Sequence, residues 1–152
     1  MCGMLGQVSN NKINKKDFET NLLKLKHRGP DDFGIYFDDN IALGQTRLSI
    51  IDLSKEGHQP MISHCDYFII IYNGEVYNFE DIKIDLIKKG YKFHSNTDTE
   101  VISNGYIEYK EKIVDKLNGM FAFAIYDKST KELFLARDKS GIKPLYYFKN
   151  ND

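Results

Sequence analysis

The sequence has no tryptophan, three prolines and only two cysteines, and its net charge is close to zero. The two cysteines, Cys2 and Cys65, are too few for the disulfide framework that holds small secreted domains together. The first residues, Met1–Met4, show neither the basic start nor the apolar core of a signal peptide. The longest apolar run, Met120–Tyr126, is too short to span a bilayer. We therefore expect a cytoplasmic protein with reduced thiols and no membrane partner.

The near-zero net charge also indicates which classes of partner the protein is expected to bind. The 152 residues carry 21 basic and 22 acidic side chains, so the formal net charge is −1, and the two signs are interspersed. A surface that binds nucleic acid would show a clear basic excess, so we expect no nucleic-acid partner. The length and a composition of 41% hydrophobic and 28% charged residues are typical of one soluble globular domain.

Apolar periodicity predicts strands and helices along the whole chain. The predicted strands lie at 4–8, 33–37, 41–51, 67–72, 120–126, 132–136 and 145–148. The predicted helices lie at 15–26, 78–89, 98–110 and 112–116. Several strands are apolar on both faces, so both of their faces must be covered. The pattern indicates an α+β fold with two packed sheets between helical layers, rather than regular βαβ alternation.

Cys2 stands directly behind the start methionine and is followed by glycine. Removal of Met1 would place a thiol and a free α-amine on the same N-terminal residue. The α-amine has a reference pKa of about 7.7–8.0, so it can accept a proton near neutral pH, and a thiolate is a strong nucleophile. A cysteine at position 2 is by itself more often an accident of sequence. The rest of the chain must decide between the two interpretations.

Seven short motifs follow one another along essentially the whole chain. They are MCG at 1–3, HRGPD at 27–31, RLSIID at 47–52, GHQPM at 57–61, YNGEVYN at 72–78, TDTE at 97–100 and ARD…GIKPLYY at 136–147. Together they resemble the N-terminal glutaminase domain of glutamine-hydrolysing asparagine synthetase, a class II glutamine amidotransferase. The motifs at 28–31 and 72–78 are more similar to that branch than to the sugar-phosphate or purine-pathway amidotransferases. The resemblance implies the N-terminal-nucleophile hydrolase fold, a four-layer αββα sandwich of two mainly antiparallel sheets between helical layers.

The resemblance also implies a catalytic and a substrate-binding role for particular residues. The Cys2 thiolate would attack the side-chain amide of glutamine to form a thioester, and the Cys2 α-amine would protonate the departing ammonia before water hydrolyses the thioester. The Asn73 amide and the Gly74 N–H would stabilise the oxyanion. Arg47 would bind the α-carboxylate of glutamine as a bidentate fork, and Asp98 would pair with its α-ammonium. Further contacts to glutamine are expected from Leu48, Ile50, Ile51 and Glu75.

Structural alternatives stay open for several of these residues. Asn73-Gly74 is also the commonest hairpin-turn signal, placed at the end of the predicted strand 67–72. Arg47 could form a structural ion pair, and Asp98 could cap or begin a helix. Gln45 stands where a histidine is common in the family, close to the proposed pocket.

The resemblance also bears on cofactors and partners. No His/Cys cluster has the ligand spacing of a metal site, so we expect no metal, and the glutaminase half-reaction requires no cofactor. In the family, further strands and an ATP- and Mg-dependent synthetase domain follow, whose Ser-Gly-Gly-x-Asp-Ser loop does not occur in this sequence. We therefore expect a glutaminase domain over residues 1–152 that is incomplete at its C-terminus and lacks the synthetase domain. Its partners would be glutamine and a synthetase domain in cis or in trans, and a homodimer is left open.

The expected function is hydrolysis of glutamine to glutamate and ammonia, which would supply asparagine synthesis from aspartate and ATP in the full-length enzyme. Two alternatives stay open. The ammonia could serve another acceptor, or the chain could be an inactive fragment that only binds a partner.

Overall fold

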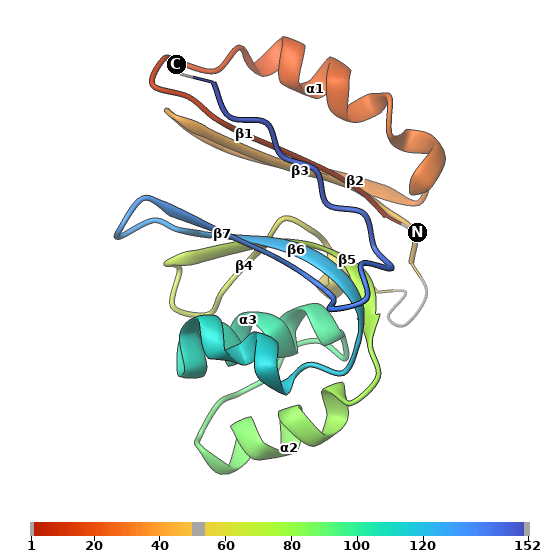
Figure 1. The fold of residues 1–152 in the computed structure, drawn as a ribbon, viewed down its shortest axis with the longest axis vertical. Helices are drawn as coiled ribbons and strands as arrows, with labels where there is room; N and C mark the ends of the chain where they lie inside the picture. The colour runs from red at the N-terminus through yellow and green to blue at the C-terminus, as the bar shows by residue number, and fades with distance from the viewer. Residues whose placement is uncertain (1, 50–53, 151–152) are drawn as a thin grey trace.

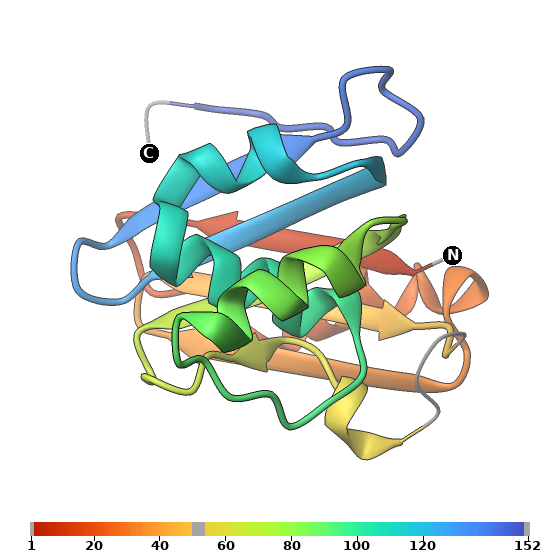
Figure 2. The same cartoon turned by 90° about the horizontal axis from the view of Figure 1, so that it is seen from below.

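The computed structural model describes residues 2–49 and 54–150, which fold into four layers (Figure 1). The first layer is helix α1 (Lys15–Leu23). The second is a sheet of β1 (Gly3–Val8), β2 (Asp32–Asp38) and β3 (Ile41–Arg47). The third is a sheet of β4 (Met61–Ile62), β5 (Phe68–Val76), β6 (Gly119–Asp127) and β7 (Glu132–Arg137). The fourth contains α2 (Phe79–Lys88) and α3 (Asp98–Tyr109), which lie across that second sheet (Figure 2). The predicted αββα layering is confirmed.

Both sheets are antiparallel and bring the N-terminus beside the second half of β5. The strand order is β1-β3-β2 in one sheet and β4-β5-β6-β7 in the other. Gly3 pairs with Thr46 at the end of β3, so the chain starts next to Arg47. β5 and β6 pair over their whole lengths, from Phe68 opposite Asp127 to Val76 opposite Gly119. This pairing makes β5 a rigid support for the residues that it carries.

The alternation of apolar side chains along the strands builds the core. In β5, Ile69 and Ile71 point between the two sheets, where they meet Leu43 of β3. Ile70 and Tyr72, which alternate with them along the strand, point instead towards α2 and α3. The strands β3, β5 and β6 are therefore buried on both faces over most of their length, which explains why the sequence shows strands without polar alternation.

The Asn73-Gly74 pair does not form the predicted turn. β5 does not end at Tyr72 but runs on through these residues to Val76, because β6 supplies a pairing partner for each of them. The turn signal of Asn-Gly is local, and here the long pairing with β6 overrides it.

Two further strand predictions differ from the structure. β3 ends at Arg47 rather than at 51, and Ile50 and Ile51 lie outside the described residues. Residues 145–148 form no strand, because no strand of the described chain pairs with them. Their apolar character indicates a strand, but Tyr146 and Phe148 are 91% and 89% exposed.

The predicted helices are present with small changes of length. α1 ends at Leu23 and is followed by a 3-10 turn at Lys26–Arg28. The short helix predicted at 112–116 is the end of a 3-10 helix at Lys110–Lys116, and another 3-10 turn lies at Lys55–Gly57. Within the described residues, no helix has the length and apolar character that crossing a membrane requires.

Candidate active site

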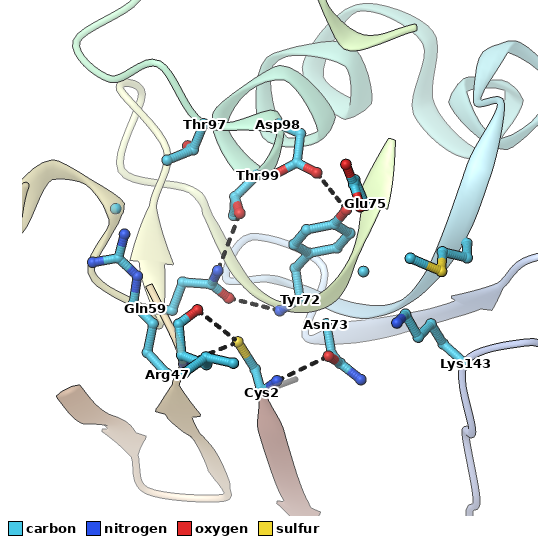
Figure 3. Close-up of a pocket in the computed structure, with 14 residues that line it drawn as sticks. Cys2, Arg47, Gln59, Tyr72, Asn73, Glu75, Thr97, Asp98, Thr99 and Lys143 are labelled. Carbon is cyan, nitrogen blue, oxygen red and sulfur yellow. Dashed lines mark hydrogen bonds between the residues drawn. The ribbon is translucent and has the colours of Figure 1, made fainter. Parts of the chain in front are cut away.

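A pocket of about 170 Å³ lies where the N-terminus meets the second half of β5 (Figure 3). The structure brings to it every predicted site residue that it describes, namely Cys2, Arg47, Leu48, Asn73, Gly74, Glu75 and Asp98. They lie in β3, β5 and α3, except for Cys2, which precedes β1, and Leu48, which follows β3. The other two predicted residues, Ile50 and Ile51, lie outside the described part of the chain.

Cys2 is held in place by three other segments of the chain. Its backbone nitrogen donates to Oδ1 of Asn73 at 3.0 Å, and its carbonyl accepts from Nε of Arg28 at 3.1 Å. The backbone of Leu48 brackets the thiol, because its N–H donates to Sγ at 3.5 Å and its carbonyl accepts from the thiol at 3.8 Å. The sulfur is therefore fixed at the wall of the pocket.

Asn73 joins Cys2 to the sheet. It is 4% exposed, and its Oδ1 is occupied by the nitrogen of Cys2. This orientation leaves the Nδ2 amide group as a donor. Asn73 thus presents a hydrogen-bond donor in the pocket that the thiol also lines.

Alternate backbone N–H groups of β5 point away from β6, towards the pocket. The N–H of Tyr72 donates to Oε1 of Gln59 at 2.7 Å, and the N–H of Val76 donates to Oδ2 of Asp98 at 3.0 Å. Gly74 lies midway between these two residues along the strand. Because N–H directions repeat every second residue in a strand, the Gly74 N–H points to the same side.

The pairing of β6 gives an independent argument for the direction of the Gly74 N–H. Phe121, which lies opposite Gly74, uses both its N–H and its carbonyl on Asp138, on the far side of β6. Opposed residues of an antiparallel pair either exchange both bonds or exchange none, so Gly74 and Phe121 exchange none. The Gly74 N–H is therefore available at the pocket.

Glycine is required at position 74 by the close approach of β6. A Cβ atom there would lie 2.4 Å from the carbonyl oxygen of Met120 and 2.7 Å from Cα of Phe121. The prediction that Gly74 serves a sharp turn is wrong, since the residue lies within a continuous strand.

Arg47 ends β3 with its guanidinium at the pocket. The side chain is 8% exposed, and Nη1 donates to the carbonyl of Ser54 at 3.0 Å. Gly57 lies so close that a Cβ atom there would be 2.0 Å from Nη2 of Arg47. The guanidinium therefore lies against bare backbone at the wall of the pocket.

Asp98 is the first residue of α3, but its side chain does not cap the helix. The cap is Thr97, whose side chain accepts from the N–H of Glu100 at 3.2 Å. Oδ2 of Asp98 accepts instead from the hydroxyl of Tyr72 at 2.5 Å and from the N–H of Val76. Burial raises the pKa of Asp98 above its ordinary value, although these two hydrogen bonds act in the lowering direction.

Several pocket residues had no functional role in the sequence interpretation, among them Gln59, Tyr72 and Lys143. Gln59 belongs to the motif at 57–61, to which we assigned no role in the site. Lys143 is 6% exposed and enters the pocket from the side opposite Arg47 (Figure 3). It is placed there by Asp138, whose carboxylate accepts from the N–H groups of Ile142 and Lys143 at 2.8 and 2.9 Å. No local signal in the sequence predicts that this turn folds back over β6.

Known structures share this architecture. Glutamine phosphoribosylpyrophosphate amidotransferase from Bacillus subtilis matches with a TM-score of 0.78 over 93% of this chain and 38% of that chain. The sequence identity is 19%, so the comparison supports the fold alone. The fold is the sandwich of the N-terminal-nucleophile type that the resemblance implied.

Sequence comparisons define the family. A model described as a glutamine amidotransferase domain matches residues 1–152. Asparagine synthetase [glutamine-hydrolyzing] 1 of Bacillus subtilis is 41% identical over 100% of this chain and 25% of its own length. Amidase chry2 of Gibberella zeae is 41% identical over 87% of this chain and 20% of its own length. The chain thus spans about a quarter of the length of such relatives. It belongs to the glutamine amidotransferase domain family, in the form found in asparagine synthetases.

Proposed function

We propose that this chain hydrolyses glutamine to glutamate and ammonia, with Cys2 as the nucleophile. The observation that carries the proposal is the pocket that the Cys2 thiol shares with two hydrogen-bond donors, the Arg47 guanidinium and the buried Asp98 carboxylate. An amide that carries an α-amino acid group matches this set of partners. Removal of Met1 is a condition, because it turns the nitrogen of Cys2 into an amine.

The reaction would proceed through a thioester. The α-amine of Cys2 takes the thiol proton, and the thiolate attacks the amide carbon, whose carbonyl electrons move to oxygen. When this tetrahedral intermediate collapses, the C–N bond breaks and the nitrogen leaves as ammonia with the proton from the α-amine. Water then attacks the thioester, which releases glutamate and returns the proton to sulfur. These steps consume one glutamine and one water, and they use no metal or cofactor.

The oxyanion would be stabilised by the Nδ2 group of Asn73 and the N–H of Gly74. The bond from Cys2 to Oδ1 of Asn73 fixes the amide with its donor end free. The pairing of β5 with β6 aims the Gly74 N–H to the same side. Donors that are fixed before the reaction stabilise the developing charge without reorganisation.

The two charged groups on Cα of free glutamine would bind to Arg47 and Asp98. The planar guanidinium matches a carboxylate in two parallel hydrogen bonds, a geometry that lysine does not offer. Asp98 would pair with the α-ammonium. Glu75 and the backbone of Leu48 line the same pocket and would contribute further contacts, together with Ile50 and Ile51.

We further infer that residues 1–152 act as a glutaminase domain whose ammonia passes to a synthetase domain in cis or in trans, for asparagine synthesis from aspartate and ATP. The relatives named asparagine synthetase support this acceptor. A second acceptor class is also supported, since amidase chry2 carries a region 41% identical to this chain.

The test is an ammonia-release assay on the purified chain, with intact mass to establish whether Met1 is absent. We expect thiol-dependent release in the parent and none in Cys2→Ala. Cys65→Ala is the matched control, because Cys65 is the other free cysteine and lies outside the pocket. A diazoketone analogue of glutamine should alkylate Cys2 alone. Processed, folded protein that neither releases ammonia nor reacts at Cys2 would refute the proposal.

A further inference from the structure

Tyr72 uses every polar atom it has to join three parts of the fold. Its carbonyl accepts from Nε2 of Gln45 in β3, and its N–H donates to Oε1 of Gln59 at 2.7 Å. Its hydroxyl donates to Oδ2 of Asp98 in α3 at 2.5 Å. The residue is 3% exposed and its ring lines the pocket (Figure 3). Tyr72 is thus a fixed point between both sheets and α3.

The same connections fix the first turn of α3. Gln59, which receives the N–H of Tyr72, donates in turn to Oγ1 of Thr99 at 3.0 Å. Thr99 follows Asp98, so β5 and α3 are joined through two adjacent residues of the helix. The two hydrogen bonds to Asp98 described above both end on Oδ2. These two donors therefore fix the position of Oδ2 at the pocket.

We infer, on the basis of the proposed function, that Tyr72 is a positioning residue that selects substrates with a free α-ammonium group. Its hydroxyl holds the Asp98 carboxylate in the ionised form and in the orientation that receives this ammonium. An ammonium gains a charge-assisted hydrogen bond only from an ionised carboxylate, and a phenol donates to that carboxylate only while it is protonated.

The electrostatics of the pair fit this role. Burial raises the pKa of Asp98, and the hydrogen bond from Tyr72 is the first of the contacts that oppose this rise. Burial and the neighbouring Asp98 raise the pKa of the Tyr72 hydroxyl far above its ordinary value, so Tyr72 stays a donor throughout the working pH range. Loss of the hydroxyl removes a lowering contribution, so the pKa of Asp98 rises further.

The main test compares Tyr72→Phe with Tyr109→Phe. Tyr109 donates to Asp85 at 2.5 Å outside the pocket, so its variant removes the same kind of bond without touching the site. In Tyr72→Phe we expect KM for glutamine to rise about 10-fold, as for the loss of one hydrogen bond to a charged group, while kcat stays within about 2-fold. Tyr109→Phe should leave both constants unchanged. An unchanged KM in Tyr72→Phe, or equal losses in both variants, overturns the inference.

The pH profile supplies a readout that a purely structural role would not move. The acid limb of kcat/KM should lie at higher pH in Tyr72→Phe than in the parent, since Asp98 must be ionised to bind the ammonium. The other titratable residues that line this pocket are Cys2, Arg47, Glu75 and Lys143, and all four are retained in the variant. A difference between the two profiles therefore reports Asp98. Identical acid limbs refute the inference.

A titration of the parent protein separates this inference from the proposed function. The carboxyl carbon of Asp98 and the hydroxyl proton of Tyr72 can be followed by NMR, with no need for activity or for a folded variant. We expect the Tyr72 hydroxyl proton to stay bound and its signal to shift at the same midpoint at which the Asp98 carboxyl carbon titrates, and two distinct midpoints overturn the pairing. If the parent released no ammonia but the signals titrated together, the proposed function would fail while the Tyr72–Asp98 pair stood.

Discussion

Gly57→Ala is expected to weaken glutamine binding without touching any atom of the reaction centre. The new Cβ atom would lie 2.0 Å from Nη2 and 2.7 Å from Cζ of Arg47, where ordinary contact begins at 3.4 Å. The guanidinium must therefore move by about 1.4 Å, the difference between 3.4 and 2.0 Å. Because the guanidinium ends a flexible side chain, it can move without unfolding the protein. The displacement instead changes the position of the two guanidinium nitrogens that would bind the substrate carboxylate.

The magnitude follows from that displacement. A misplacement of about 1 Å in a positioning group can cost about 10²-fold, and the bidentate geometry of Arg47 depends on both nitrogens. We expect KM for glutamine to rise about 10- to 100-fold, with kcat within a few-fold of the parent. The reacting groups Cys2, Asn73 and Gly74 keep their contacts, so the rate at saturation should persist.

The assay is steady-state ammonia release against glutamine concentration, together with thermal unfolding. Gly6→Ala serves as the control, because its Cβ would approach only the end of the Leu43 side chain, at 3.3 Å, outside the pocket. A folded Gly57→Ala chain with unchanged KM would refute the assignment of Arg47 to the substrate carboxylate.

Two further predictions concern Asn73 and Asp138. Asn73→Asp keeps an acceptor for the nitrogen of Cys2 but replaces the Nδ2 donor with a negative oxygen. We therefore expect kcat to fall about 10²–10³-fold with little change in melting temperature. An unaltered kcat would exclude Asn73 from the oxyanion site. Asp138→Ala should lower the free energy of unfolding by about 3 kcal/mol in urea titrations at pH 7, since three backbone N–H groups lose their acceptor, those of Phe121, Ile142 and Lys143. These hydrogen bonds hold the pKa of Asp138 below its ordinary value, so its contribution is complete above that value and is lost as the pH falls through the lowered pKa. The difference between parent and variant should therefore shrink in acid, and a constant difference would contradict the assignment.

Much of the architecture could be predicted from the sequence, because its signals are local. Strands that are apolar on both faces, such as 67–72 and 120–126, require cover on both sides, and this requirement indicates the layered sandwich. The position of Cys2 behind the start methionine made it the candidate nucleophile. The motifs around Asn73, Arg47 and Asp98 indicated which residues to place beside it.

Local signals failed where a distant partner decided the outcome. Asn73-Gly74 has the composition of a turn, yet β6 pairs with it and keeps it in a strand. Residues 145–148 have the composition of a strand, yet no described strand pairs with them.

The sequence by itself determined the layers, and it indicated the candidate nucleophile and the residues to expect around it. Only the tertiary structure decided how these residues meet. Asn73 receives the nitrogen of Cys2 across 71 positions of sequence, and Tyr72 donates to Asp98 across 26. The Gly74 N–H points to the pocket because of the register in which β5 pairs with β6. The position of the Arg47 guanidinium depends on the absence of a side chain at Gly57. Such contacts leave no periodic trace in the chain, because packing between separate elements creates them.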